Sequence, residues 1–283
     1  MVSISVVMPA FNVDIPVLEE SVNSILSQTF RDFEFIIIDD CSTNGFYSFF
    51  KEFQDERIRL IRNTEHLGIT KSLNIGFREA RGKYIARMDG DDISLPTRFE
   101  RQFAFMESHP DVIVCGTNVE FFGMTSANYI RKITDMETYR VELLFGNPGP
   151  MHPTAFFNRE LLQRYQIAYD EKLEYAQDYG LWVEISRLGQ VAILEDILLR
   201  YRMHDYQISQ SFREKQILCD KLTKEKLLRE LLGVVTREEL DLHYLISTWN
   251  RRNIKPDAEM KNWLRRLVEA NYKKGIYSRN LLE

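Results

Sequence analysis

The feature that most constrains the fold is an alternation of strand-like and helix-like segments over residues 2–92. Apolar, β-branched runs predict buried strands at residues 2–8, 33–38, 58–61 and 84–88. Between them, apolar residues recur at helical spacing over residues 16–26, 46–53 and 69–80. Strands joined by helical crossovers form a parallel sheet, so the loops that follow the strands meet at one edge. The sequence therefore predicts an α/β fold with a binding site at that edge.

Three carboxylates, Asp89, Asp91 and Asp92, follow the last of these strands. They stand at a strand-to-helix turn, because residues 93–96 are expected to begin the next helix. Like charges this close repel each other unless a cation or hydrogen-bond donors compensate them. Carboxylate oxygens suit Mg²⁺ or Mn²⁺, and Mg²⁺ usually binds one or two carboxylates together with substrate phosphates. The pattern favours a metal site for a diphosphate ligand, and the alternative is a solvated turn in which Asp92 caps the next helix.

Two common phosphate-binding loops are absent from the sequence. No G-x-G-x-x-G follows the first predicted strand, and G-x-x-x-x-G-K-[ST] occurs nowhere. We therefore expect a bound diphosphate to be held through a metal ion.

Composition and charge exclude several classes of protein. A formal net charge of -5 argues against wholesale nucleic-acid binding, which needs a basic surface. The three cysteines, Cys41, Cys115 and Cys219, are widely spaced and indicate neither a disulfide framework nor a zinc site. The first strand follows the N-terminus without a basic leader or cleavage site, and no apolar run reaches transmembrane length. A protein of the reducing cytoplasm is therefore expected.

Three motifs, taken in order, carry a resemblance to a known family. They are SVVMPAFN at residues 5–12, IIIDDCST at 36–43 and ARGKYIARMDGDD at 80–92. Together they resemble the family 2 glycosyltransferases of GT-A fold, although Cys41 replaces the usual glycine and His66 a frequent asparagine. The resemblance implies a mixed, mostly parallel central sheet flanked by helices. It also implies a nucleotide-binding half at residues 1–95, an acceptor half at 96–210 and a helical C-terminal appendage at 211–283.

The resemblance also implies roles for residues of the nucleotide-binding half. Pro9, Ala10 and Phe11 are expected to line the base pocket, and Asp40 is expected to accept the imide N–H of uracil if the donor is a UDP-sugar. The neighbouring Asp39 either joins this site or bonds the backbone of its own turn.

The phosphates and the metal are expected next to the acidic turn. By similarity, Asp89 binds the ribose or the water shell of the metal, and Asp91 ligates Mn²⁺ or Mg²⁺ that bridges the diphosphate. Lys71 and Arg87 are within reach of the phosphates, or are an ordinary surface lysine and a strand-flanking arginine. Asp92 is assigned to the pocket for the donor sugar and acceptor.

The acceptor half carries the expected catalytic base, Asp178. It resembles the acidic motif of the family, in which a carboxylate removes the proton of the acceptor hydroxyl during an inverting transfer. Its alternative role is an N-cap of the helix that follows. Gln177, where the family often has glutamate, and His152, in a proline-rich loop at residues 147–154, are expected near the donor sugar. A histidine that anchors this loop through hydrogen bonds is the alternative for His152.

The segment YRMH at residues 201–204 resembles the family's tyrosine-arginine-x-histidine ending. It implies that His204 completes the metal shell, since imidazole is also a good ligand for Mn²⁺. A simple loop hydrogen bond is the alternative. Arg202 and Ser209 are expected to assist phosphate binding.

Residues 211–283 predict a long helix and then a helical hairpin whose last helix starts at Pro256. Cations and apolar residues are interleaved in the final segment: Arg251, Arg252, Lys255, Lys261, Arg265, Arg266, Lys273, Lys274 and Arg279 with Trp249, Trp263, Leu264, Leu267 and Tyr272. Such a face favours contact with an anionic bilayer. A solvated outer face and a homodimer contact are the alternatives.

The expected function is therefore an inverting, metal-dependent transfer of a sugar from a nucleotide-diphosphate donor, a UDP-sugar, to a hydroxyl of a glycan. By resemblance, the acceptor belongs to bacterial capsule, O-antigen or exopolysaccharide synthesis and is carried on a lipid. Two alternatives are a non-catalytic nucleotide-sugar binding module and a sugar-1-phosphate nucleotidyltransferase. The latter is disfavoured because residues 9–13 form no glycine-rich basic loop.

Overall fold

The computed structural model describes residues 2–204, 212–248 and 257–283. Its first part alternates strands and helices as expected: β1 Ile4–Ala10, α1 Ile15–Leu26, β2 Phe33–Asp39, α2 Phe46–Glu52, β3 Ile58–Arg62, α3 Ile69–Glu79 and β4 Tyr84–Arg87. The second part is more irregular: β5 Ile93–Ser94, α4 Arg98–Ser108, β6 Val112–Gly123, β7 Ala127–Tyr129, α5 Met136–Phe145, η1 His152–Thr154, β8 Phe156–Asn158, α6 Arg159–Arg164, α7 Gln177–Leu188 and β9 Gln190–Met203. The C-terminal helices are α9 Arg213–Leu232, α10 Arg237–Ser247, α12 Ala258–Lys274 and α13 Arg279–Leu282.

One mixed sheet organises the chain, in the order β3-β2-β1-β4-β8-β6-β9-β5, with β7 paired to β6. The pairs β1/β2, β1/β4, β2/β3 and β6/β9 are parallel, whereas β8 is antiparallel to both β4 and β6. Every residue of β1 is buried, because helices cover both faces of the sheet. The fold is thus the expected mixed, mostly parallel α/β architecture.

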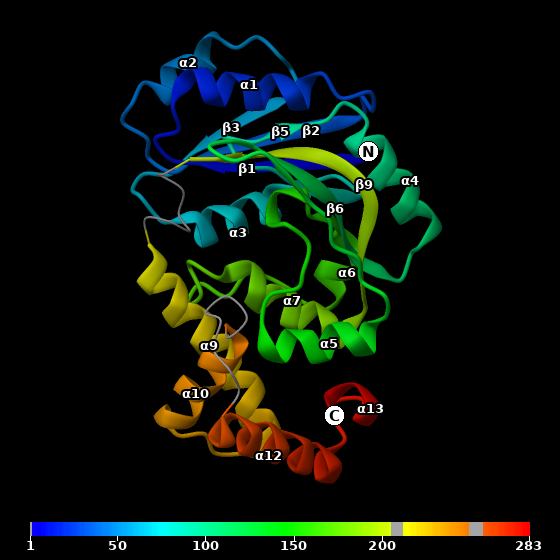
Figure 1. Cartoon of the computed structure of the whole chain (residues 1–283). Coiled ribbons are helices and arrows are strands. Elements are labelled where there is room, and N and C mark those ends of the chain that lie inside the picture. The colour runs from blue at the N-terminus through cyan, green and yellow to red at the C-terminus, as the bar shows by residue number, and fades with distance from the viewer. Residues whose placement is uncertain (1, 205–211, 249–256) are drawn as a thin grey trace.

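Two hydrophobic cores lie on the two faces of the sheet. Val6 and Met8 of β1 pack with residues of α1, α2 and α4, and Val7 packs on the opposite face with residues of α3, α5 and α7. Figure 1 shows α1 and α2 on one side of the sheet and α3, α7 and α5 on the other. This alternation follows from the two-residue period of a strand.

The C-terminal helices extend the core that contains Val7 and do not form a separate core. Leu227 and Leu228 of α9, Ile246 of α10 and Trp263 of α12 belong to the same buried cluster as Tyr179 of α7. The expected domain boundary between residues 210 and 211 lies outside the described residues, as do Trp249, Arg251, Arg252, Lys255 and the expected helix start at Pro256. None of the helices in the described ranges is long and apolar enough to cross a bilayer.

The sequence-based prediction for residues 93–96 is wrong. Ile93 and Ser94 form β5, antiparallel to Leu199 and Arg200 of β9, and the helix begins only at Arg98. The backbone N–H of Leu95 also donates to the carbonyl of Leu198 at 3.0 Å. Pairing with a distant strand therefore overrides the local helical preference. Residues 112–123 form one long strand, β6, and residues 190–203 form another, β9. The pairing of these two strands changes register near Thr117 and Asn118.

Candidate active site

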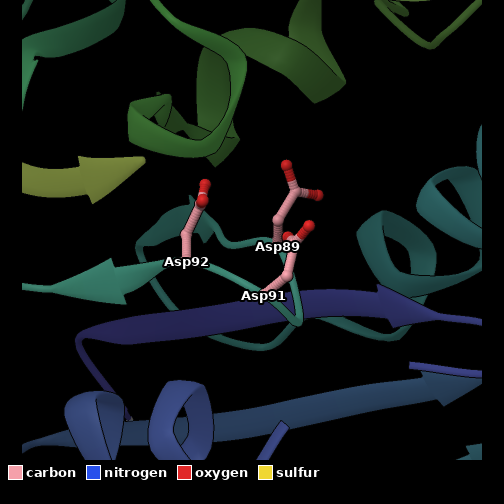
Figure 2. A group of neighbouring side chains, drawn as sticks. All are labelled: Asp89, Asp91 and Asp92. Carbon is pink, nitrogen blue, oxygen red and sulfur yellow. The ribbon is translucent and has the colours of Figure 1, made fainter. Parts of the chain in front are cut away.

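The three acids after β4 lie together. One carboxylate oxygen each of Asp89, Asp91 and Asp92 lies within 4.8 Å of the other two. Figure 2 shows their side chains rising from the turn that leads from β4 toward β5. They stand at the carboxyl-terminal edge of the parallel strands, where α/β folds bind their ligands.

Asp92 is the buried member of this cluster, with 1% of its surface exposed. Its Oδ1 accepts a hydrogen bond from the backbone N–H of Arg202 at 2.9 Å, while its Oδ2 is buried without a hydrogen-bond partner. Burial raises the pKa of Asp92, and the neighbouring Asp91 and Asp89 raise it further. The alternative that Asp92 caps the next helix is wrong, because the N-cap of α4 is Thr97.

The end of β9 meets this acidic turn. The Nε2 atom of His204 lies 2.9 Å from Oδ2 of Asp91, and Nε of Arg202 donates to the carbonyl of Asp91 at 2.8 Å. Arg202 also binds Glu20 at 2.5 Å on the outer side. His204 and Asp91, predicted to be metal ligands, are thus neighbours. Ser209, predicted to assist phosphate binding, lies outside the described residues.

Two buried arginines lie behind the acids. Arg87, with 2% of its surface exposed, forms an ion pair with Asp89 and donates from Nη1 to Oδ2 of that residue at 2.5 Å. Burial raises the pKa of Asp89 despite this pairing, and the charge of Asp91 adds to the effect. Arg98 donates from Nη2 to the carbonyl of Arg87 at 2.8 Å, and burial lowers its pKa to about 9. The two arginine charges partly offset the repulsion among the three acids.

Arg98 was not singled out from the sequence. Its Nε donates to Gln102 at 2.9 Å, and Gln102 in turn donates to the carbonyl of Thr154 at 2.8 Å. The signal was available in part: Arg98, Gln102 and Met106 follow one helical stripe whose residues are all buried. Polar residues on the buried stripe of a helix indicate a hydrogen-bonded network inside the protein.

Asp178 lies in the first turn of α7, whose N-cap is Ala176, so the N-cap alternative for Asp178 is wrong. Its Oδ2 accepts a hydrogen bond from Nδ2 of Asn147 at 2.8 Å, and its Oδ1 accepts one from the backbone N–H of Tyr179 at 2.8 Å. Burial raises the pKa of Asp178, and the positive charge of Arg87 acts in the opposite direction. Asp178 and Asp89 both act electrostatically on Arg87 and on Tyr169, so the two acids face a common region.

His152 lies in this region but is buried, with 9% of its surface exposed. Its Nε2 lies 2.8 Å from the hydroxyl of Tyr169, and its ring meets Trp182 edge to face. Burial holds the pKa of His152 well below its ordinary value, and Arg87 lowers it further. His152 therefore does anchor its loop, as one alternative predicted. Gln177 is buried at the first position of α7.

The expected base pocket surrounds Asp40 at the end of β2. Oδ1 of Asp40 accepts hydrogen bonds from Asn63 at 2.7 Å and from the backbone N–H of Leu67 at 2.9 Å. Its Oδ2 accepts one from the N–H of Gly68 at 2.8 Å and lies 2.9 Å from Nδ1 of His66. Each carboxylate oxygen of Asp40 thus has two partners within the protein, which occupy its hydrogen-bonding positions.

Aromatic rings lie over this carboxylate. Phe11 is 43% exposed and stacks on His66, with ring centroids 4.0 Å apart. Pro9 and Ala10 are buried at the end of β1, and Lys71 is exposed in the first turn of α3. Pro9, Ala10 and Asp40 thus lie at the carboxyl-terminal ends of the neighbouring strands β1 and β2.

Asp39 bonds its own turn. Its Oδ1 accepts a hydrogen bond from the backbone N–H of Ser42 at 2.8 Å, and its Oδ2 pairs with Nε of Arg62 at 3.3 Å. The turn-residue alternative for Asp39 is therefore the arrangement found.

Comparison with known proteins identifies the family. The sequence model of the family described as "Glycosyl transferase family 2" matches residues 5–166, more than half of the chain. The chain belongs to glycosyl transferase family 2. The matched region of this family 2 member contains the expected base pocket, the three acids and His152.

Two relatives and one solved structure of similar fold are informative for this family 2 glycosyltransferase. An uncharacterized glycosyltransferase of Haemophilus influenzae is 33% identical over 243 residues, which cover 80% of this chain and 72% of that protein. The glucosyltransferase WfgD of Escherichia coli, named for UDP-Glc and α-D-GlcNAc-diphosphoundecaprenol, is 27% identical over 75% of this chain and 81% of its own. The crystal structure of S. aureus TarS 1-349 in complex with UDP-GlcNAc superimposes with a TM-score of 0.69 at 18% identity, covering 95% of this chain and 81% of that chain. The chain is thus a glycosyltransferase related to enzymes of polysaccharide biosynthesis.

Proposed function

We propose that this protein transfers a sugar, with inversion and with a divalent metal, from a UDP-sugar to a hydroxyl of a glycan acceptor. The observation that carries the proposal is the acidic turn, where Asp89, Asp91 and Asp92 lie together and Oδ2 of Asp91 lies 2.9 Å from Nε2 of His204. Arg87 pairs with Asp89 in this turn, and its positive charge also lowers the pKa of Asp178. A carboxylate suited to a base thus lies within electrostatic range of a turn suited to a metal-bound diphosphate.

Asp178 is the proposed catalytic base. Burial raises the pKa of Asp178, and a carboxylate with a raised pKa is a stronger base than an ordinary aspartate. Asn147 and the N–H of Tyr179 fix its orientation through one hydrogen bond to each oxygen. Asp178 thus holds the proton that the acceptor hydroxyl loses as it attacks C1 of the donor sugar.

The acidic turn fits a divalent cation. Asp92 has a buried oxygen without a partner, and the oxygens of Asp89 and Asp91 lie within 4.8 Å. We propose Asp91 and His204 as ligands of Mn²⁺ or Mg²⁺, with Asp89 on the ribose or on metal-bound water. When bound, the ion neutralises negative charge on the leaving diphosphate.

The base pocket supports a uridine donor. Phe11 and His66 offer exposed ring faces on which a base can stack, and Lys71 stands in the first turn of α3 near the phosphates. Asp40 holds the loop through the N–H groups of Leu67 and Gly68, and its proposed contact with the uracil imide requires one of these donors to move. UDP-GlcNAc in the TarS complex and UDP-Glc in the name of WfgD support the proposal of a UDP-linked donor.

A lipid-linked glycan is the proposed acceptor. WfgD is named for an acceptor on diphosphoundecaprenol, and α12 presents exposed Lys261, Arg265 and Lys273 beside exposed Leu264 and Tyr272. This basic face suits peripheral contact with an anionic inner membrane surface from the cytoplasm, and a homodimer contact is its alternative.

The test is UDP release from a panel of UDP-sugars with Mn²⁺, with GDP-sugars as the comparison for the base. We expect release that needs the metal and increases with an acceptor glycan. UDP binding without release from any donor would indicate a binding module instead. Diphosphate release from a nucleoside triphosphate and a sugar 1-phosphate would indicate a nucleotidyltransferase.

A further inference from the structure

Two aromatic rings and a lysine form a platform at the start of α9. The rings of Tyr175 and Phe212 lie 5.0 Å apart, and 41% of the surface of Phe212 is exposed. The ammonium of Lys215 lies 5.3 Å from the ring centroid of Tyr175 and 5.2 Å from that of Phe212. We call these three residues the aromatic platform.

Tyr175 links the platform along the chain to residues of the proposed active site. This residue comes just before Ala176, the N-cap of α7, and three residues before Asp178. The preceding Glu174 packs on Gly68, because an added Cβ there would lie 2.1 Å from its Oε1. Figure 1 shows α9 starting on the side of the molecule toward which the β9 arrow points. In the sequence, Tyr175 therefore lies between Glu174, which packs on Gly68 beside Asp40, and Asp178, the proposed base.

The lysine of the platform is open to an anion. In the part of the chain that the structure describes, no carboxylate pairs with Lys215, whose contacts are the two rings and the Tyr175 hydroxyl at 3.4 Å. An ammonium held over ring faces keeps its donor hydrogens available for a further acceptor. By contrast, Lys221 and Lys226 on the same helix pair with Asp241 and Glu184 at 2.5 Å.

Exposed aromatic rings suit a sugar ring. The axial C–H bonds of a pyranose carry partial positive charge, and the face of an aromatic ring carries partial negative charge. A ring face beside an unpaired cation thus matches a sugar that carries a phosphate or another anionic group. Phe212 and Lys215 are both exposed, so part of each side chain is accessible to a ligand.

We propose that Tyr175, Phe212 and Lys215 form the acceptor subsite, and that this subsite takes a sugar ring linked to an anionic group such as a diphosphate. The inference rests on the proposed function, because it assigns the second substrate of the same reaction. It adds a substrate class, since a neutral glycan would offer Lys215 no anion, and no carboxylate of the described residues pairs with this lysine.

The experiment measures the affinity of short-chain alkyl diphosphates of glucose, galactose and N-acetylglucosamine by titration calorimetry with UDP and Mn²⁺ present. The neutral alkyl glycosides of the same sugars serve as comparison probes. The full-length protein is compared with Phe212→Ala and Lys215→Met. Leu218→Ala, 60% exposed on the same helix, and Lys226→Met, exposed on that helix and paired with Glu184, are the matched controls.

We expect the wild type to bind at least one diphosphate probe about tenfold more tightly than its neutral counterpart. Lys215→Met should abolish that preference, and Phe212→Ala should weaken both kinds of probe about fivefold, while UDP affinity and both controls change less than twofold. The proposal is overturned if the wild type shows no preference, if either variant binds as the wild type does, or if UDP affinity falls in parallel. Failure of the proposed function would instead appear as absent UDP binding in the wild type, before any acceptor probe is added.

Discussion

The Nε2 atom of His204 lies 2.9 Å from Oδ2 of Asp91, although 113 residues separate them in the sequence. The contact depends on β9, which carries His204 past β6 and β5 to the acidic turn. The backbone N–H of Arg202 donates to Oδ1 of Asp92, and this bond holds β9 in its register beside β5. The second part of the chain thus supplies one side of the proposed metal site.

Asp91→Asn should weaken UDP binding in Mn²⁺ by about tenfold or more, because loss of a ligand charge lowers metal affinity. Binding of UDP without metal should change little. Titration calorimetry with and without Mn²⁺ checks this, and Glu20→Gln, which removes only an exposed partner of Arg202, is the control. Equal affinity of Asp91→Asn and wild type in Mn²⁺ would exclude Asp91 as a ligand.

Asp178→Asn should reduce sugar transfer by about 10²–10⁴-fold, the usual contribution of general base catalysis. UDP affinity should stay within about twofold, because Asp178 contacts Asn147 and Tyr179 rather than the base pocket. Initial rates with a saturating donor check the prediction. The control is Asp170→Asn, an exposed acid that bonds the N–H of Lys172 in the preceding loop. Normal transfer by Asp178→Asn would remove this residue from the mechanism.

Transfer should rise with pH as Asp178 ionises, and the midpoint should lie above the ordinary aspartate range because burial raises the pKa of Asp178. The hydrogen bond from Asn147 stabilises the ionised form and lowers that pKa. Asn147→Ala should therefore move the acid limb of the rate profile to higher pH. A profile of kcat/KM from acid to neutral pH measures it. A shift to lower pH, or none, would contradict the assignment of the limb to Asp178.

Gly68→Ala should lower the free energy of unfolding by about 1–3 kcal/mol and weaken UDP binding. Gly68 has φ +87°, and a Cβ there would collide with Glu174. Its N–H also holds Asp40. Gly146→Ala is the matched control, since Gly146 has extended backbone and nothing within 4 Å of an added Cβ. Chemical denaturation and UDP titration measure both effects, and equal behaviour of the two variants would refute the prediction.

The free energy of unfolding should fall in acid, because His243 is buried in its neutral form. Its Nε2 donates to the carbonyl of Leu144 at 2.8 Å and its Nδ1 accepts from Trp263 at 3.1 Å, so the ring is neutral, and burial lowers its pKa to about 4. Between about pH 6.5 and 4 the unfolded chain binds this proton and the folded chain does not, so stability rises with pH in that window.

The size of this effect is on the order of 3 kcal/mol between its two limits, from the shift of the His243 pKa to about 4. His243→Gln should have a flatter dependence of unfolding free energy on pH than the wild type, as measured by denaturation at a series of pH values. His109→Gln, at an exposed position, should keep the wild-type dependence. Parallel curves for His243→Gln and the wild type would contradict the prediction.

Local patterns in the sequence predicted the secondary structure of residues 2–88 closely. Each predicted strand and helix of residues 2–88 is present to within a few residues, because β-branched runs and helical spacing act over short distances. The two residues of β5 escaped prediction because their partner, β9, lies about a hundred residues further along the chain. Short strands made by long-range pairing leave little local signal.

Motifs placed the acids of the site but not their surroundings. Asp89, Asp91, Asp178 and His204 were identified from their motifs, and their roles stay predictions. The four donors around Asp40 and the buried Arg98 behind Arg87 depend on loops and helices that meet only in the folded chain. Burial of an arginine in particular is decided by tertiary packing, since most arginines are exposed.

The Arg98 and Gln102 network has a consequence for how such enzymes diversify. It joins the strand that precedes the acids to the strand and loop of the acceptor half, through the carbonyls of Arg87, Cys115 and Thr154. Chimaeras that graft the second half of one relative onto the first half of another cut across this seam. With this chain as the first half, such a chimaera should stay active only if the grafted half brings a side chain that binds the Arg87 carbonyl as Arg98 does.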